Sequence, residues 1–374
     1  MKSSRTKGDM LMKKPGLMKI VLSFVALVPL TYLGAADAEA YKVLVLGDVH
    51  YDAPELHAEL NYVKRPVFRR NVNMWKKATP ELLTLAAKRA EAEKPEFAIQ
   101  LGDIVQGDGG NAELQKRMLR AGFAAVKKYF PRLPLWVVKG NHDVRLRIGS
   151  NDNAPANEVL MPLVAAEFGI SGLENGNHAF RRGRDLYISV DGFIPAPEVA
   201  AFVKKALEDN ADARYVFLLT HLPVLPADPA VPFWLLPGHY EVAELLETRP
   251  SVILAAHTHV PSIGTRVTAR GKIVQLVVTS MGCEWNPKSV MVPRFDSWQK
   301  VLEYGKTLRA AGMNRGNDRR WPVLASKGDY TFREFFRNSG FVMLDVDDER
   351  VAARYFIDGG DAPGARIVLF ERRK

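Results

Sequence analysis

The chain has 374 residues, of which 47% are hydrophobic and 25% are charged, so it can bury a substantial core, and this excludes a disordered protein. The only cysteine, Cys283, excludes an internal disulfide and a metal cluster held by several thiolates. The formal net charge is +10 at pH 7, and the length allows one large domain or two modest ones.

The first 40 residues have the layout of a secretory signal peptide. Three lysines precede an apolar stretch at 20–33, and Ala38-Glu39-Ala40 then provides a cleavage site of small residues. The stretch is shorter than the roughly 20 residues that a membrane span requires. We therefore expect cleavage near Ala40, a periplasmic or secreted mature chain from Tyr41, and no stable membrane insertion afterwards. An uncleaved N-terminal anchor is the alternative.

Apolar, β-branched runs alternate with helical patterns through the rest of the chain, which predicts an α/β fold. The expected strands lie at 42–46, 97–101, 135–138, 186–190, 215–219, 252–255, 273–279, 340–346, 352–357 and 365–370. The expected helices lie at 80–93, 112–129, 197–208, 241–247 and 297–311. The first of these helices is expected to have Thr79 as its N-cap and Pro80 at its first position, where the missing N–H of proline costs nothing.

Five polar clusters stand at the carboxyl ends of expected strands. They are Gly47-Asp48-Val49-His50, Gly102-Asp103, Gly140-Asn141-His142-Asp143, Thr220-His221 and His257-Thr258-His259, and together they hold 5 of the 8 histidines. In open α/β sheets the loops at the carboxyl ends of the strands meet in one crevice, and ligands bind there. The sequence therefore predicts one site that is built from five loops.

The spacing Asp-x-His in the first cluster and His-x-His in the last indicates metal ligation. Residues two apart in an extended segment point to the same side, so each pair could reach one ion. Carboxylate oxygen combined with imidazole nitrogen suits Zn, Mn or Fe better than Ca. The two oxygens of Asp103 could bridge two ions. Any one cluster alone is more often a turn, an N-cap or an incidental histidine, so the interpretation depends on all five in this order.

With these motifs the chain resembles the calcineurin-like metallophosphoesterases, whose pattern is D-x-H, G-D, G-N-H-[DE], H and G-H-x-H, from about residue 41 to residue 263. The resemblance implies a four-layer α-β-β-α sandwich with two mixed sheets and a dinuclear metal site at the carboxyl ends of the strands. It assigns Asp48, His50 and His259 to one metal, Asp103 to a bridge, and Asn141, His221 and His257 to the second metal. His142 would lie on the leaving-group side as an acid or a stabiliser of the transition state, with Asp143 or Asp103 orienting its ring.

The chain departs from the patterns of some relatives of that family. Ala256 stands where the family usually has glycine. The Asp-Arg-Gly sequence of Ser/Thr protein phosphatases is absent after Asp103, and Gln106 stands where purple acid phosphatases have tyrosine. The second and third differences argue against those two subgroups.

Residues at about 285–338 interrupt the late strands and carry 11 Lys and Arg against 5 Asp and Glu. We interpret them as a basic insertion within a single metallophosphoesterase domain, 41–374. Arg319 and Arg320 in this insertion, and Arg145 after the third cluster, could bind an anionic substrate, with plain surface charge as the alternative. The expected partner is a small anionic phosphoester. No paired aromatic–basic repeat favours specific nucleic-acid binding, and nothing in the sequence indicates an oligomeric state.

We therefore expect an exported phosphoesterase that uses two transition-metal ions (Mn, Fe or Zn) and hydrolyses a phosphomonoester or phosphodiester by attack of a metal-bridging hydroxide. One alternative is a noncatalytic metal-binding or scaffold protein of the same fold, and another is a different metallohydrolase such as an amidase. The retention of every expected ligand together with His142 favours the phosphoesterase.

Overall fold

The computed structural model describes residues 40–58, 64, 66–227, 234–259, 261–282, 303, 329–334, 339–357 and 362–372. The expected signal peptide, the expected helix at 297–311 and most of the basic insertion lie outside the described residues. The chain divides into two compact units, Met1–Thr31 and Tyr32–Lys374, and the second unit carries all the elements below. Within the described ranges, no helix combines the length and the apolar composition that a membrane crossing requires.

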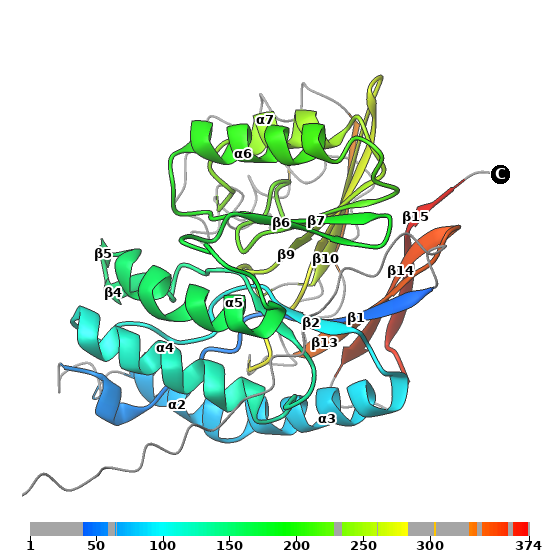
Figure 1. The fold of residues 1–374 in the computed structure, drawn as a ribbon. Coiled ribbons are helices and arrows are strands. Elements are labelled where there is room, and N and C mark those ends of the chain that lie inside the picture. Colours follow the sequence, from blue (N-terminus) through cyan, green and yellow to red (C-terminus); the bar gives the residue numbers. More distant parts are fainter. Residues whose placement is uncertain are drawn as a thin grey trace, which may run out of the picture. The chain divides into compact units, whose positions relative to one another are not determined.

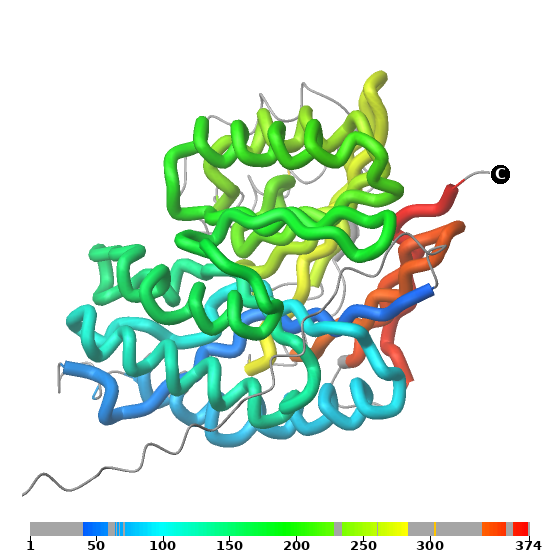
Figure 2. The backbone as a smooth tube through the Cα atoms, in the orientation of Figure 1, coloured from blue at the N-terminus to red at the C-terminus, as the bar shows by residue number. Residues whose placement is uncertain are grey.

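The first sheet has six strands in the order β15-β14-β13-β1-β2-β3. Its parallel part consists of β1 (Tyr41–Leu46), β2 (Phe97–Gln100) and β3 (Leu135–Val137). The antiparallel part consists of β13 (Gly340–Val346), β14 (Arg350–Ile357) and β15 (Ala365–Glu371). In Figure 2 the blue amino-terminal strand lies beside the orange and red carboxyl-terminal strands, so the two ends of the domain sequence pair within one sheet.

Helices cover the outer face of this sheet (Figure 1). They are α2 (Pro66–Lys76), α3 (Ala78–Glu93) and α4 (Ala112–Lys127), while α5 (Met161–Phe168) packs against β3. Leu83 of α3 and Met118 of α4 are fully buried in the main hydrophobic core. The single turns η1 (Pro54–Leu56) and η2 (Ala156–Leu160) and the short hairpin of β4 (Arg145–Arg147) and β5 (Ser150–Asn151) lie in the connecting segments.

The second sheet has seven strands in the order β12-β10-β11-β9-β8-β7-β6. They are β6 (His178–Arg182), β7 (Asp185–Ser189), β8 (Val216–Leu219), β9 (Ser251–Ala255), β10 (Ser262–Thr268), β11 (Gly271–Val277) and β12 (Asp329–Glu334). Strand β12 belongs to the expected basic insertion, so the part of the insertion described there extends this sheet.

Alternating side chains of the second sheet face two different layers. Leu186 and Ile188 pack in one cluster with α6 (Ala196–Asp209) and α7 (His239–Leu246), whereas Tyr187 joins the core that contains the first sheet. Figure 1 shows α6 and α7 on the side of this sheet that faces away from β1 and β2. The layers are therefore helix, sheet, sheet and helix, and the expected four-layer α-β-β-α sandwich with two mixed sheets is confirmed.

A buried polar network joins the two sheets at the start of β1. The hydroxyl of Tyr41 donates to Asp185 Oδ2 at 2.8 Å, and Arg214 donates to the same carboxylate through Nε at 2.8 Å and Nη2 at 2.5 Å. Tyr41 begins the first strand of one sheet and Asp185 begins β7 of the other. Asp185 and Arg214 both belong to segments of the second sheet, so the hydrogen bond from Tyr41 links this buried ion pair to the first sheet.

Every expected strand is present, and its ends differ from the expected ones by at most two residues. The expected N-cap of the helix at 80–93 is wrong, because α3 begins at Ala78 and Thr79 is fully buried in its first turn. Lys77 stands at the N-cap position and makes no capping hydrogen bond through its side chain. Helix α2 ends at Lys76 and continues almost directly into α3, so no free helix start is left for Thr79 to cap.

Glu93 links α3 to the first sheet and predicts a pH-dependent stability. Arg354 donates to its two oxygens at 2.8 and 2.5 Å, and Lys42 donates at 3.0 Å. The hydrogen bonds from Arg354 are the largest cause that lowers the pKa of Glu93 from 4.5 to about 2. The carboxylate therefore stabilises the fold above pH 4.5, and this contribution is lost as the pH falls through about 2.

We expect Glu93→Gln to lower the free energy of unfolding at pH 7 by about 2–3 kcal/mol. The difference from the wild type should shrink as the pH falls from 4.5 towards 2, as measured by urea denaturation at a series of pH values. Glu91→Gln, on an exposed position of the same helix, is the matched control. An equal loss from Glu93→Gln at pH 3 and at pH 7 would mean that the carboxylate charge is not the source of the effect.

Candidate metal centre

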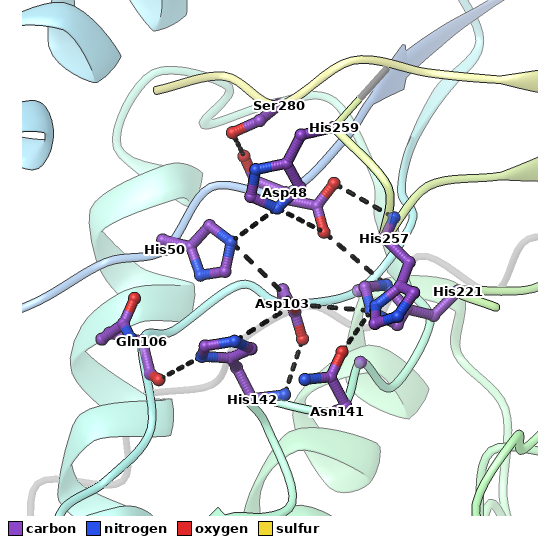
Figure 3. Close-up of polar contacts among 12 residues, drawn as sticks. Asp48, His50, Asp103, Gln106, Asn141, His142, His221, His257, His259 and Ser280 are labelled. Carbon is purple, nitrogen blue, oxygen red and sulfur yellow. Dashed lines mark hydrogen bonds and ion pairs between the residues drawn. The ribbon is translucent and has the colours of Figure 1, made fainter. Parts of the chain in front are cut away.

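The five polar clusters meet at one end of the two sheets (Figure 3). Asp48 and His50 follow β1, Asp103 follows β2, Asn141 and His142 follow β3, His221 follows β8, and His257 and His259 follow β9. Strands β2, β3, β8 and β9 are fully buried and β1 is buried except at Lys42, so their apolar side chains fix the position at which each loop begins. The structure thus brings together all seven residues that the resemblance assigned as ligands, and His142 with them.

One group of ligand atoms consists of Asp48, His50 and His259. The Nε2 atoms of His50 and His259 lie 3.1 Å apart, and His259 Nε2 lies 3.7 Å from Asp48 Oδ1. These ligand atoms are one carboxylate oxygen and two imidazole nitrogens. They come from the ends of two strands and lie close enough together to bind one metal ion.

A second group consists of Asp103, His221 and His257, with Asn141 beside it. His221 Nε2 lies 3.4 Å from Asp103 Oδ2, 3.1 Å from His257 Nδ1 and 2.9 Å from Asn141 Oδ1. Asp103 Oδ2 also lies 3.9 Å from His50 Nε2 of the first group. The carboxylate of Asp103 therefore stands between the two groups, in the position that a bridging ligand requires.

The electrostatics of these groups fit a bound cation. Asp48 is fully buried, its Oδ1 accepts no hydrogen bond from the described residues, and burial raises the pKa of this carboxyl. Burial and the neighbouring His142 lower the pKa of His50, and burial and the neighbouring His221 lower that of His257. A metal ion would compensate the buried carboxylates and bind the imidazoles of His50 and His257 in the neutral form that burial favours. Although burial alone lowers it, the nearby carboxylates of Asp103 and Asp48 raise the pKa of His221 to about 9, so an ion there would replace a proton. The donor set suits Mn, Fe or Zn.

The main chain is strained at four ligands. His50, Asp103, His257 and His259 have φ angles of 50°, 54°, 70° and 58°. Non-glycine residues rarely adopt this left-handed region, and it persists where the surrounding structure enforces it, often at functional sites. Here the buried strands before each ligand enforce the turn, and the turn directs the side chain into the centre.

His142 lies on one side of Asp103 with its ring fixed by the main chain. Its Nδ1 lies 2.5 Å from the carbonyl oxygen of Gln106, so Nδ1 carries a proton and donates to that carbonyl. Nε2 then faces the centre, 4.0 Å from Asp103 Oδ2. The ring of His142 meets that of His50 edge-on at 4.7 Å. This imidazole is therefore oriented to exchange a proton through Nε2 with a group bound at the centre.

Asp143 contacts the main chain of the site. Its oxygens accept the N–H groups of Gly140 at 2.8 Å, Asp103 at 2.9 Å and Val105 at 3.2 Å. Burial and the nearby charge of Asp103 raise the pKa of Asp143 to about 8. Asp143 therefore fixes the two loops relative to each other, while Gln106 holds the ring of His142.

Gly140 permits the close approach of these loops. A Cβ atom at this position would lie 2.1 Å from the amide nitrogen of Asp103 and 2.2 Å from its Oδ1. We expect Gly140→Ala to displace the bridging carboxylate and to lower metal content, measured by elemental analysis of the purified protein. Gly149→Ala, at a turn with a positive φ and open space around it, is the control: it adds backbone strain without a steric clash and should keep the metal content. Full metal content in Gly140→Ala would show that the loops can move apart.

Arg145, a candidate substrate-binding residue, lies behind His142. It donates to Asp108 through Nε at 2.9 Å and Nη2 at 2.6 Å, and Nη2 lies 2.9 Å from His142 Nδ1. The other two candidates, Arg319 and Arg320, lie outside the described residues. The guanidinium of Arg145 therefore lies beside the Nδ1 edge of His142.

We expect Arg145→Met to lower kcat about tenfold with little change in KM, because this packing orients the imidazole. The control is Arg147→Met, two residues further along the same hairpin and exposed. A large rise in KM with an unchanged kcat would instead support direct binding of the substrate by Arg145.

Two further residues near the site, Asp52 and His57, were not predicted from the sequence. His57 is buried, with Nε2 2.6 Å from Asp52 Oδ1 and Nδ1 2.9 Å from the carbonyl oxygen of Asp108. This pair connects the loop after β1 to the segment that holds Arg145. Asp52 does follow Asp48 and His50 at a spacing of two, but its partner His57 could be identified only from the path of the chain.

Comparisons with known proteins agree with this geometry. The profile of the family described as calcineurin-like phosphoesterase matches residues 41–261, and the chain belongs to that family. No curated protein sequence matches it. The structure of PhoD aligns with a TM-score of 0.53 and 10% identity over 89% of this chain and 69% of that one. A dimetal phosphatase from Danio rerio aligns with a TM-score of 0.51 and 12% identity over 89% of this chain and 99% of that one. At these identities the likeness concerns the fold.

Proposed function

We propose that the protein is an exported, metal-dependent phosphoesterase that hydrolyses a phosphomonoester or a phosphodiester. The observation that carries the proposal is the pair of ligand groups that share Asp103, with the Nε2 of His142 directed at them. Membership of the calcineurin-like phosphoesterase family supports phosphoester hydrolysis as the reaction.

The first group, with Asp48, would hold one ion, and the second group, with Asn141, would hold the other. When bound, two ions at such a site polarise the phosphoryl group and lower the pKa of water towards neutrality. Protonated His142 would supply its Nε2 proton to the leaving oxygen, because Nδ1 is committed to Gln106. Because the carboxylates of Asp48 and Asp103 are buried, solvent screens their interaction with a bound ion only weakly.

The test of this proposal is hydrolysis of p-nitrophenyl phosphate and bis(p-nitrophenyl) phosphate by the purified chain. The protein is stripped of metal and then titrated separately with Mn, Zn and Fe. We expect the stripped protein to be inactive and turnover to return with about two ions per chain. The ratio of the two rates would distinguish a monoesterase from a diesterase. Two bound ions without turnover of any phosphoester would favour a noncatalytic metal-binding or scaffold protein.

Two features support export: the signal-peptide layout of the first 40 residues and the position of the first described strand. Strand β1 starts at Tyr41, one residue after the expected cleavage site, so cleavage at Ala40 would remove none of the described elements. Amino-terminal sequencing of the protein recovered from a bacterial periplasm should give Tyr41 as the first residue. Recovery of the uncleaved chain in the membrane fraction would support an N-terminal anchor.

A further inference from the structure

Trp234 is an exposed aromatic side chain that contacts the metal centre. Its ring lies 4.8 Å from the ring of His257 at an angle of 59°, and 43% of the residue is exposed. Four large hydrophobic residues are exposed in the part of the chain that the structure describes, namely Ile148, Trp234, Val267 and Val368. A single exposed apolar residue is ordinary. Trp234 differs because it is the aromatic one and touches a candidate metal ligand.

The main chain that carries Trp234 is well anchored. Leu236, two residues later, is fully buried against α6 and α7, and its N–H donates to the carbonyl oxygen of Pro223 at 2.8 Å. The side chain of Gln275 in β11 fixes the turn that follows Pro223, because its Oε1 accepts the N–H groups of Val224 and Leu225 at 2.8 Å each. The indole is therefore attached to a fixed part of the second sheet, and a ligand that stacks on it orders little additional chain.

Trp234 and His142 contact opposite sides of the centre. His142 groups with His50 and Asp103, whereas His257 groups with His221 and Asp103. In Figure 3 the rings of His142 and His257 lie on the two sides of Asp103. If His142 gives its proton to the leaving oxygen, a group that stacks on Trp234 is a different substituent of the same phosphorus.

We infer that Trp234 is a stacking surface for a planar aromatic group on the ester oxygen that is not cleaved, so that the substrate is a phosphodiester. The inference rests on the proposed phosphoesterase function and adds a substrate class to it. In the reaction, a water oxygen forms a new bond to phosphorus and the P–O bond to the leaving group breaks. One proton of the water is released to solvent at neutral pH, the leaving oxygen receives the Nε2 proton of protonated His142, and the other proton of the water restores that imidazolium. The product is a phosphomonoester that keeps the aromatic group on Trp234.

The test compares two substrates with the same leaving group, bis(p-nitrophenyl) phosphate and methyl p-nitrophenyl phosphate. The wild type should have a kcat/KM about tenfold higher for the first substrate, because base–aromatic stacking is worth roughly this factor or more. Trp234→Leu keeps an apolar side chain without a ring. In this variant the ratio of the two kcat/KM values should fall close to the ratio of the uncatalysed hydrolysis rates of the two substrates. Trp234→Phe should keep part of the preference.

Val267→Ala is the matched control. Val267 has the same exposed fraction, 43%, but it pairs with Lys272 at the turn between β10 and β11, beside the first residue of β9. The candidate ligands follow the last residue of β9, so Val267 lies at the opposite end of the sheet. This variant should keep the wild-type ratio, and a changed ratio would point to a general effect of removing exposed apolar surface.

A binding measurement separates this inference from the proposed function. Isothermal titration of the metal-loaded protein with diphenyl phosphate and dimethyl phosphate should show about tenfold tighter binding of the first, and Trp234→Leu should remove this difference. Absence of turnover with either nitrophenyl substrate would count against the phosphoesterase function. Turnover with the same substrate ratio and the same diphenyl phosphate affinity in Trp234→Leu would overturn the role of Trp234 and leave the function intact.

Discussion

Replacing Asp103 with asparagine is expected to lower phosphoesterase activity on the order of a thousandfold or more and to reduce the content of both metals. Asp103 Oδ2 lies 3.4 Å from His221 Nε2 and 3.9 Å from His50 Nε2, so one carboxylate serves two ligand groups. An amide keeps the shape but offers one acceptor oxygen in place of two and removes a buried negative charge. Both ion sites should therefore weaken at once.

The measurement is metal content by elemental analysis together with turnover at saturating Mn. Asp212→Asn, on a carboxylate that is 77% exposed and paired with Arg181, is the matched control and should keep both properties. Loss of one ion with retention of the other would mean that Asp103 binds a single ion. Circular dichroism of the variant checks that the fold remains, because Asp103 Oδ1 also accepts the N–H of His142 at 2.7 Å.

The position of the site could be predicted because it depends on rules that apply along the whole sequence. Buried strands appear as short apolar runs, and the residues after them lie at one edge of a sheet. Strand β13 matches the expected bounds, and β1 differs by one residue. Once the ends of the strands are known, the five clusters are expected to meet, because loops at the carboxyl ends of such strands converge on one crevice. The family resemblance then supplied the pairing of the two sheets, which local pattern does not contain.

Strands without an apolar alternation could not be predicted. In β10 the buried positions include Ser262, Gly264 and Arg266, so the inward face does not appear hydrophobic in the sequence. Arg266 is tolerated there because it forms an ion pair with Glu247, which is also buried. Strand β6, at the edge of the same sheet, has only half-buried residues. Both strands form hairpins, β6 with β7 and β10 with β11, so each depends on pairing with its neighbour and not on an apolar pattern of its own.

The details of the site that depend on the main chain were also beyond prediction. The acceptor for His142 Nδ1 is a carbonyl group, that of Gln106, and any residue type could supply it. The positive φ angles at His257 and His259 likewise belong to the path of the chain. Sequence identifies side chains with suitable chemistry, whereas their orientation comes from contacts between segments that are distant in sequence.

Replacing His142 with alanine is expected to lower kcat by about 10²–10³-fold while both metals remain bound. The alternative that the geometry allows is ligation, since His142 also forms a possible ligand group with His50 and Asp103. We favour the acid role because the two other groups already provide a carboxylate and two imidazoles each.

The two roles of His142 differ in a measurable way. An acid matters most for a poor leaving group, so His142→Ala should slow phenyl phosphate hydrolysis by about tenfold more than p-nitrophenyl phosphate hydrolysis. His178→Ala, on the half-buried edge strand β6, should affect neither substrate. Loss of one metal ion from His142→Ala, with equal effects on both substrates, would make His142 a ligand. Retention of both ions with the unequal effect would assign the proton on the leaving oxygen to His142 Nε2.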